Sequence, residues 1–314
     1  MYKKILIPLD GTQLAELVLP YAKELAGRLD LDITILRICT PDEEAFKAMH
    51  RIYIEHIAET IANQAMEIQM TTSLPAKFKP INTKGELVVG YPAEEILNYA
   101  NNHRVDFIIM ATHGYSGLKR WRLGSVADKV LRASRVPVLL VRTEVSNEIA
   151  YDKWPNKTLI VPLDGSRTAE SVIPHVEILA KQRGTVPIDI ILLGVCEQPT
   201  ISSDYPEAVM PISWEEHVEQ TIAWCKLGTK QYLERIANQI SETVGLKVKS
   251  KVLMGNPAEE IIKYSNRHHF SLIVMATYGR SGIFRWAYGS VADRVLRGGS
   301  SPIFLVRPRR PKQN

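Results

Sequence analysis

Hydrophobic positions along the chain fall into short apolar runs that alternate with longer amphipathic segments. In the first 144 residues the apolar runs predict five strands, at residues 4–9, 32–38, 81–89, 105–111 and 136–141. Several runs are apolar at every position, which is typical of strands buried on both faces. The segments between them predict helices at residues 13–29, 43–70, 92–102 and 125–133. Because Pro20 lies inside the first of these helices, we expect a kink there, and Pro174 predicts the same in the second half.

The second half of the chain repeats the first. Residues 89–132 recur as residues 254–297, and about 30 of the 53 positions from Gly90 to Arg142 are identical to residues 255–307 without a gap. Residues 5–12 likewise recur as 159–166. Matching residues of the two copies are 154 positions apart at residues 5–12 and 165 positions apart from Gly90 onward. The second copy therefore carries eleven extra residues, which we place in or near residues 198–213.

This repeat predicts two domains of one fold class. We expect a first domain at residues 1–144, a linker at 145–155, a second domain at 156–308 and a basic tail at 309–314. Alternating strands and helices predict an α/β fold in each half, namely a doubly wound five-stranded parallel sheet of order 3-2-1-4-5 with helices on both faces. In such sheets ligands bind beyond the carboxyl ends of the strands, here between the first and fourth.

The fifth strands of the two halves, at residues 136–141 and 301–306, are expected at the sheet edges. A long apolar edge strand requires a partner. We expect the two fifth strands to face each other in an internal pseudo-dimer, although pairing between two chains in a homodimer would satisfy the same edges.

Composition narrows the class of protein. With 45% hydrophobic and 23% charged residues, the 314-residue chain can bury ordinary cores. No apolar run approaches the ~18 residues that span a bilayer or resembles a signal peptide, so no membrane partner is expected. Three cysteines without metal-site or disulfide spacing favour the cytoplasm. Part of the net charge of +5 lies in residues 307–312, so nucleic acid is an unlikely partner.

A glycine-containing loop follows the fourth strand in both halves. Gly114 is followed by nine residues and then by Gly124 and Ser125, which open a helix; the second half has Gly279, nine residues, Gly289 and Ser290. A glycine turn that leads into a helix N-terminus leaves main-chain N–H groups unpaired and suits an anion such as phosphate. An ordinary helix cap is the alternative.

A carboxylate follows the first strand in both halves, at Asp10 and at Asp164, each before a glycine. At this edge of the sheet it could accept hydrogen bonds from ribose hydroxyls or hold a divalent ion beside a polyphosphate. The alternative is an Asx turn that caps the next helix.

Together these loops resemble those of the universal stress protein family, in a tandem form with two domains in one chain. The family pattern of glycine, two residues, glycine, nine residues, then glycine and serine or threonine is matched in both halves except at its first position, which is Ala111 or Ala276 here. A methyl group there weakens binding if the main chain must approach the ligand closely or adopt a positive φ.

The resemblance implies an adenine-nucleotide site in each half. Asp10 and Asp164 would contact the ribose or a metal-bridged phosphate, and main-chain groups near Ile38 and Val195 would meet the adenine. The phosphates would be bound by the loop residues, together with the alanines at the start of the pattern: Ala111, Gly114, Gly124, Ser125 and Val126 in the first half, and Ala276, Gly279, Gly289, Ser290 and Val291 in the second.

The resulting hypothesis is a cytoplasmic, regulatory stress-response protein that binds ATP or another adenine nucleotide in each half, with Mg²⁺ or Mn²⁺ as a companion ion. No catalytic residue is assigned, because no base or arginine finger is identifiable, and any ATP hydrolysis should be slow. The alternative is a scaffold or interaction module of the same fold that binds no nucleotide and has an unidentified protein partner.

Other candidate residues have simpler explanations. His103 and His268 fall at a helix end, where capping is expected. Cys39 and Cys196 follow the expected adenine-contact positions and are interpreted as buried packing residues.

Overall fold

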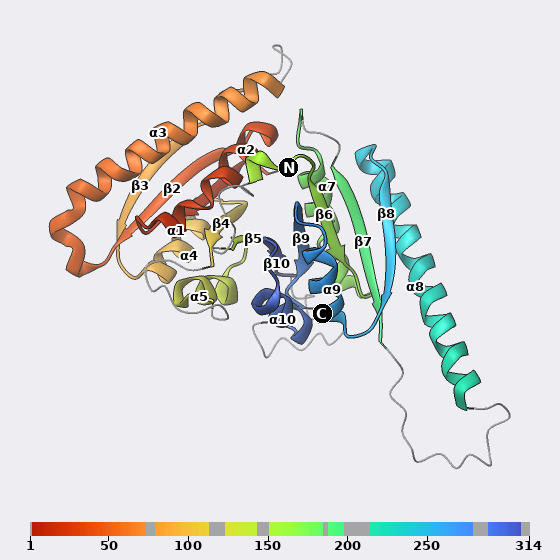
Figure 1. Ribbon diagram of the computed structural model, residues 1–314. Helices are drawn as coiled ribbons and strands as arrows, with labels where there is room; N and C mark the ends of the chain where they lie inside the picture. The colour runs from red at the N-terminus through yellow and green to blue at the C-terminus, as the bar shows by residue number, and fades with distance from the viewer. Residues whose placement is uncertain are drawn as a thin grey trace, which may run out of the picture.

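The computed structural model describes residues 2–72, 79–112, 123–142, 151–184, 188–197, 214–278 and 288–308. Ten strands form one continuous sheet in the order β3-β2-β1-β4-β5-β10-β9-β6-β7-β8 (Figure 1). Their bounds are β1 (Lys4–Pro8), β2 (Asp32–Cys39), β3 (Thr83–Val89), β4 (Phe107–Ala111), β5 (Val138–Val141), β6 (Thr158–Pro162), β7 (Asp189–Cys196), β8 (Val248–Met254), β9 (Ser271–Ala276) and β10 (Ile303–Val306).

Each half of the sheet has the expected order 3-2-1-4-5, and every pairing within a half is parallel. The fold class predicted from the sequence is therefore confirmed. The two halves meet where β5 pairs antiparallel with β10, with Leu139 opposite Phe304. The fifth strands face each other as expected, and this pairing joins the two five-stranded sheets into one.

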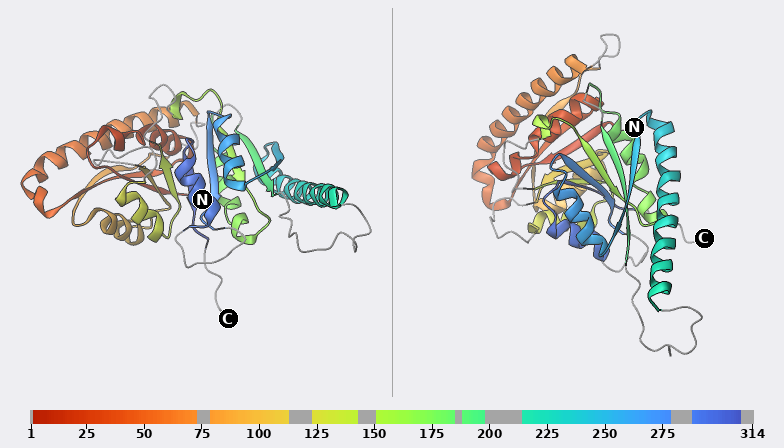
Figure 2. Two further views of the ribbon diagram at one scale, coloured as in Figure 1. Left: turned by 60° about the horizontal axis from the view of Figure 1, so that its bottom comes forward. Right: turned by 45° about the vertical axis from the view of Figure 1, so that its right-hand side comes forward.

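Helices cover both faces of the sheet. Their bounds are α1 (Gln13–Glu16), α2 (Leu19–Leu29), α3 (Lys47–Thr72), α4 (Pro92–Asn102), α5 (Ser125–Ala133), α6 (Arg167–Glu170), α7 (Ile173–Ala180), α8 (Trp214–Val244), α9 (Pro257–Asn266) and α10 (Ser290–Gly298), with 3-10 turns η1 (Pro41–Phe46) and η4 (Tyr151–Lys153). One apolar core lies under α2, α3, α7 and α8, and a second lies under α4, α5, α9 and α10. Figure 2 shows the long helices α3 and α8 at opposite ends of the molecule.

The first helix of each half is broken, not kinked as predicted. Helix α1 ends at Glu16 and α2 begins at Leu19, with Pro20 in its first turn. A proline at position 20 has no N–H to donate to Glu16, and its ring would clash with that carbonyl group, so the helix must stop and restart. Pro174 occupies the same place in α7.

The extra residues of the second half are not all where the sequence suggested. Lys4 pairs with Asp32, whereas Thr158 pairs with Asp189, so the connection between the first two strands is already three residues longer in the second half. The other eight extra residues lie between β7 and β8. Residues 198–213, where all eleven were expected, lie outside the described residues.

Among the described residues, no helix combines the length and the apolar character needed to cross a membrane.

Candidate functional site

A cavity opens at the carboxyl ends of β1, β2 and β4 in the first half, and a matching cavity opens in the second half. The first has a volume of about 280 Å³ and the second of about 290 Å³. Each cavity is lined by the start of a helix, α5 in the first half and α10 in the second. The loop after the first strand of the same half forms another part of the lining. This is the switch point at which a doubly wound sheet binds ligands.

Most of the residues singled out from the sequence line these two cavities. They are Asp10, Ile38, Ala111, Gly124, Ser125 and Val126 in the first cavity, and Asp164, Val195, Ala276, Gly289, Ser290 and Val291 in the second. Gly114 and Gly279 lie outside the described residues, as do residues 115–122 and 280–287 that follow them.

Within the described residues, the helices α5 and α10 begin at these cavities with neither a side-chain cap nor a proline in the first turn; α2, α4 and α7 also lack a side-chain cap but begin with a proline. Gly124 precedes α5, and no side chain caps that helix within the described part of the chain; the same holds for Gly289 and α10. By contrast, Thr12 caps α1 and Asn256 caps α9 through their side chains. The first N–H groups of a helix lack intrahelical partners. The cavities therefore have the donor-rich, electropositive end that an anion requires.

A main-chain hydrogen bond holds each of these helix starts against the sheet. The N–H of Gly124 donates to the carbonyl of Thr112 at 2.8 Å, and the N–H of Gly289 donates to the carbonyl of Thr277 at 2.7 Å. Both threonines directly follow a strand of the central sheet, β4 or β9. The loop between strand and helix is thus closed at its base in both halves.

Asp10 forms the Asx turn that was its alternative role, and it also lines the cavity. Its Oδ1 atom accepts hydrogen bonds from the N–H of Thr12 at 3.0 Å and from the Thr12 hydroxyl at 2.6 Å. Gly11 between them has a φ of +81°, which favours glycine. Asp164 makes the same contacts with Ser166, at 2.9 and 2.6 Å. These contacts fix the carboxylate at the cavity wall.

Ile38 lies where β2 extends past the end of β1. The last register pair of the two strands is Leu36 with Pro8, and the carbonyl of Leu36 accepts from Leu9 at 2.9 Å. In a parallel sheet, the N–H and carbonyl groups of every second residue in a strand point toward the same adjacent strand. The N–H and carbonyl of Ile38 therefore point to the β1 side, beyond the last residue of that strand. Val195 has the same relation to β6, since Leu193 accepts from Leu163.

Ala111 and Ala276, which replace the first glycine of the family pattern, have no conformational penalty here. Asp30 and Arg104 are the non-glycine residues with positive φ among those described, so neither alanine adopts the conformation that favours glycine. Each alanine ends a central strand, β4 or β9. The positive-φ concern raised from the sequence does not apply, and only the space taken by the methyl group remains.

Sequence reasoning missed several polar residues that line the cavities. Arg37 lines the first cavity and is 6% exposed, with its Nη2 atom 2.9 Å from Glu43 Oε1. Its one signal in the sequence was a positive charge between the apolar residues Leu36 and Ile38. Gly194 takes its place in the second half. Thr277 lines the second cavity, and its hydroxyl oxygen is buried without a hydrogen-bond partner.

The two histidines at helix ends act as expected. The ring of His103 hydrogen-bonds the carbonyl of Tyr99 through Nδ1 at 3.0 Å, and that of His268 hydrogen-bonds the carbonyl of Tyr264 at 2.8 Å. Each ring also stacks on the tyrosine that it contacts.

With this geometry in place, comparison with known proteins decides the family. The sequence profile of the Universal stress protein family matches residues 1–142 and again residues 155–307. The chain belongs to the universal stress protein family. It carries the family's domain twice, as its internal repeat indicated.

Relatives exist at both the single-domain and the tandem length. The universal stress protein MJ0577 of Methanocaldococcus jannaschii is 31% identical over 159 residues, which cover 46% of this chain and 98% of that protein. A universal stress protein of Mycolicibacterium smegmatis is 23% identical over 310 residues, 97% of each chain. The crystal structure of a universal stress protein from Archaeoglobus fulgidus covers 97% of this chain and 98% of its own, with a TM-score of 0.61 and 21% identity. That similarity shows a shared fold.

Proposed function

We propose that this universal stress protein binds ATP or another adenine nucleotide in each of its two cavities and acts as a regulatory binding protein in the stress response. The observation that carries the proposal is the pair of helix starts without side-chain caps, each facing a cavity at the switch point of its half. Phosphate oxygens would accept hydrogen bonds from these N–H groups, and the helix dipole would favour their charge.

The remaining cavity residues are assigned to the other parts of the nucleotide. The adenine would lie against the apolar walls near Ile38 and Val195 and bond to main-chain groups there. Asp10 and Asp164 would accept from ribose hydroxyls or hold Mg²⁺ or Mn²⁺ beside the phosphates. Volumes of 280 to 290 Å³ lie near the lower end of the ~300–1,000 Å³ common for small-molecule sites.

Slow hydrolysis at most is expected of these sites. Asp10 and Asp164 are held in Asx turns, and the sequence offers no identifiable base or arginine finger to position the attacking water, which is what makes phosphoryl transfer fast. Steady-state turnover of ATP at tens per second by the purified chain would contradict this assignment.

A cytoplasmic location fits the thiols. None of the three cysteines, which all lie among the described residues, is in a disulfide; Cys39 and Cys196 are buried, and Cys225 is exposed. An exposed thiol outside any disulfide is compatible with a reducing compartment.

The proposal is tested by introducing a negative charge at the first residue of α5 and of α10. Ser125→Glu and Ser290→Glu each place a carboxylate where a phosphate would bind, at exposed positions where an acidic residue also favours the helix. Isothermal titration of the full chain with ATP and Mg²⁺ should give two sites for the parent, one for each single variant and none for the double variant. Gln13→Glu adds the same charge to the first turn of α1, where the residue does not line the cavity, and should leave both sites intact.

The scaffold hypothesis gives the opposite result. If the parent chain takes up no adenine nucleotide, and mass spectrometry of the denatured protein finds none released, nucleotide binding is wrong and a module with empty cavities remains. Binding that is equal in the parent and the double variant would instead show that the helix starts are not the phosphate site.

A further inference from the structure

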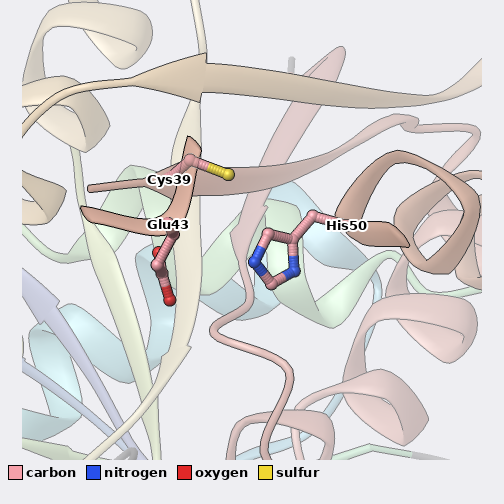
Figure 3. Close-up of side chains that lie close together, drawn as sticks. All are labelled: Cys39, Glu43 and His50. Carbon is pink, nitrogen blue, oxygen red and sulfur yellow. The ribbon is translucent and has the colours of Figure 1, made fainter. Parts of the chain in front are cut away.

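Three side chains with metal-binding chemistry come together at the end of β2, outside the residues that line the first cavity. They are Cys39, the last residue of β2; Glu43, in η1; and His50, in the first turns of α3. One ligand atom from each lies within 4.8 Å of the others. Figure 3 shows the imidazole of His50 extending from its helix toward the other two side chains.

The position of Glu43 is fixed by hydrogen bonds on both carboxylate oxygens. Its Oε2 atom accepts from the N–H of Thr40 at 3.1 Å in a capping box, and its Oε1 atom lies 2.9 Å from Arg37 Nη2. A carboxylate oxygen has two lone pairs, so each can still coordinate a cation. Partners of this kind orient a metal ligand without binding the metal themselves.

The other two members of the cluster are shielded from water to different degrees, since Cys39 is buried and His50 is half-buried. The Cys39 side chain is fully buried. The Nε2 atom of His50 is also buried, and it has no hydrogen-bond partner. Buried polar atoms are nearly always paired, so an unpaired imidazole nitrogen beside a thiol and a carboxylate indicates a missing partner.

We propose that Cys39, Glu43 and His50 bind one Zn²⁺ ion, with a water molecule as the fourth ligand. Sulfur, imidazole nitrogen and carboxylate oxygen form the donor set that zinc favours, whereas Mg²⁺ and Ca²⁺ prefer oxygen alone. Ligand atoms around a tetrahedral zinc ion lie about 3.3–3.8 Å apart. The three ligand atoms here lie within 4.8 Å of one another and would draw closer together around the ion.

Binding displaces the thiol proton to solvent, after which the thiolate and the Glu43 carboxylate face the zinc ion together with the Arg37 guanidinium that already pairs with Glu43. In the second half the matching cysteine, Cys196, lies 3.4 Å from the hydroxyl of Thr229. The described residues of that half contain no cluster of this kind, and we therefore propose the ion for the first half alone.

Cobalt substitution tests the proposal directly. All proteins carry Cys225→Ser, which removes the exposed thiol. Titration of the full chain with Co²⁺ should produce a thiolate-to-cobalt charge-transfer band that saturates at one equivalent and disappears when Zn²⁺ is added. Cys39→Ser should abolish the band, and His50→Ala should weaken Co²⁺ binding at least tenfold. A magnesium ion bound with nucleotide in the cavity gives no such band, so the outcome does not depend on the proposed nucleotide site.

Matched variants separate coordination from simple damage to the fold. Cys196→Ser removes the other buried thiol, and His56→Ala removes an exposed imidazole from the same helix as His50. Both should titrate like the parent. The zinc site is refuted if the parent shows no thiolate band, or if His50→Ala and His56→Ala give the same titration. If Cys39→Ser does not fold, the comparison of the two histidine variants decides.

Discussion

Glu24 interacts with two cations in the buried space between the halves. Its Oε2 atom lies 2.7 Å from Lys157 Nζ and 2.6 Å from Arg28 Nε. The side chains of Glu24 and Lys157 are each 6% exposed, and the ammonium group lies over the ring of Tyr151, 4.4 Å from its centre. Removal of one partner from such a pair leaves the other charge buried and uncompensated.

Glu24→Gln should therefore lower the free energy of unfolding by about 3 kcal/mol. Urea denaturation of the full chain measures the change. The control is Glu260→Gln, which breaks the contact of Glu260 with Lys263 at 2.8 Å on the surface and should cost less than about 1 kcal/mol. Equal effects of the two variants would show that the buried pair contributes no more than a surface pair.

His175 is a second titratable group at the boundary between the halves. Its Nδ1 atom is hydrogen-bonded to the hydroxyl of Tyr2, and its ring lies near those of Tyr2 and Phe304. Burial lowers the pKa of His175 from 6.5 to about 4. The folded protein therefore resists protonation of this ring at a pH where the unfolded chain accepts a proton.

The sign of the pH dependence follows from this depressed pKa. Above pH 6.5 neither state binds the proton, so the contribution of His175 to stability is fully present. It is lost as the pH falls from 6.5 to about 4, a loss of about 2 kcal/mol after allowance for partial exposure. Unfolding free energies of the parent and of His175→Gln, measured from pH 7.5 to 4.5, should differ in slope over this window. Parallel curves would rule out the assignment, and His269→Gln, at an exposed position, serves as the control.

At the scale of elements, α2 packs closely on α3 because Gly27 has no side chain. A Cβ atom added at Gly27 would lie 2.6 Å from the carbonyl oxygen of Ala65 and 2.8 Å from Cβ of Ile68. Gly228 in α8 is a glycine without such a constraint, because a Cβ atom there would meet nothing within 4 Å. Substitution of these two helical glycines should have opposite effects.

Gly27→Ala should destabilise the protein by about 1–3 kcal/mol, since overpacking outweighs the better helix propensity of alanine. Gly228→Ala should stabilise it by up to about 1 kcal/mol. Thermal and urea unfolding of both variants measure the two signs. A stabilised Gly27→Ala variant would show that α3 can move away from α2 at little cost.

At the scale of the whole molecule, the pairing of β5 with β10 removes two exposed sheet edges. Leu139 and Phe304, which face each other across this pair, are both fully buried. An unpaired apolar edge strand favours association with another chain. The pairing that joins the two domains is therefore also what should keep the full chain from pairing with a second one at this edge.

A protein that contains only residues 1–142 should consequently dimerise through β5. Light scattering coupled to size exclusion should show a dimer for this half and a monomer for the full chain at equal concentration. A lone half that stays monomeric at high concentration would show that the edge strand can be covered in another way. A dimeric full chain would point to a further interface elsewhere.

Local pattern accounts for much of the fold and for part of the candidate site. Apolar runs predicted the strands because a strand buried on both faces must be apolar throughout, and the repeat predicted that both halves share one topology. Asp10 and Gly124 were identifiable because turns and helix starts need particular residues nearby in sequence. Whether they bind a nucleotide stays a prediction.

The limits of the sequence lie in contacts between residues that are far apart along the chain. Glu24 meets Lys157 across 133 positions, and Arg37 reaches the cavity wall, because the packing of whole elements brings them there. Cys39, Glu43 and His50 come from three different elements, and their spacing matches no short metal motif. The sequence by itself determined the strands, most of the helices and the repeat, since these follow from periodicity and self-similarity, and the strand order that it predicted is confirmed by the pairing of the strands. Only the tertiary structure decided which polar groups are buried together, because burial depends on the surfaces that the packed elements remove from water.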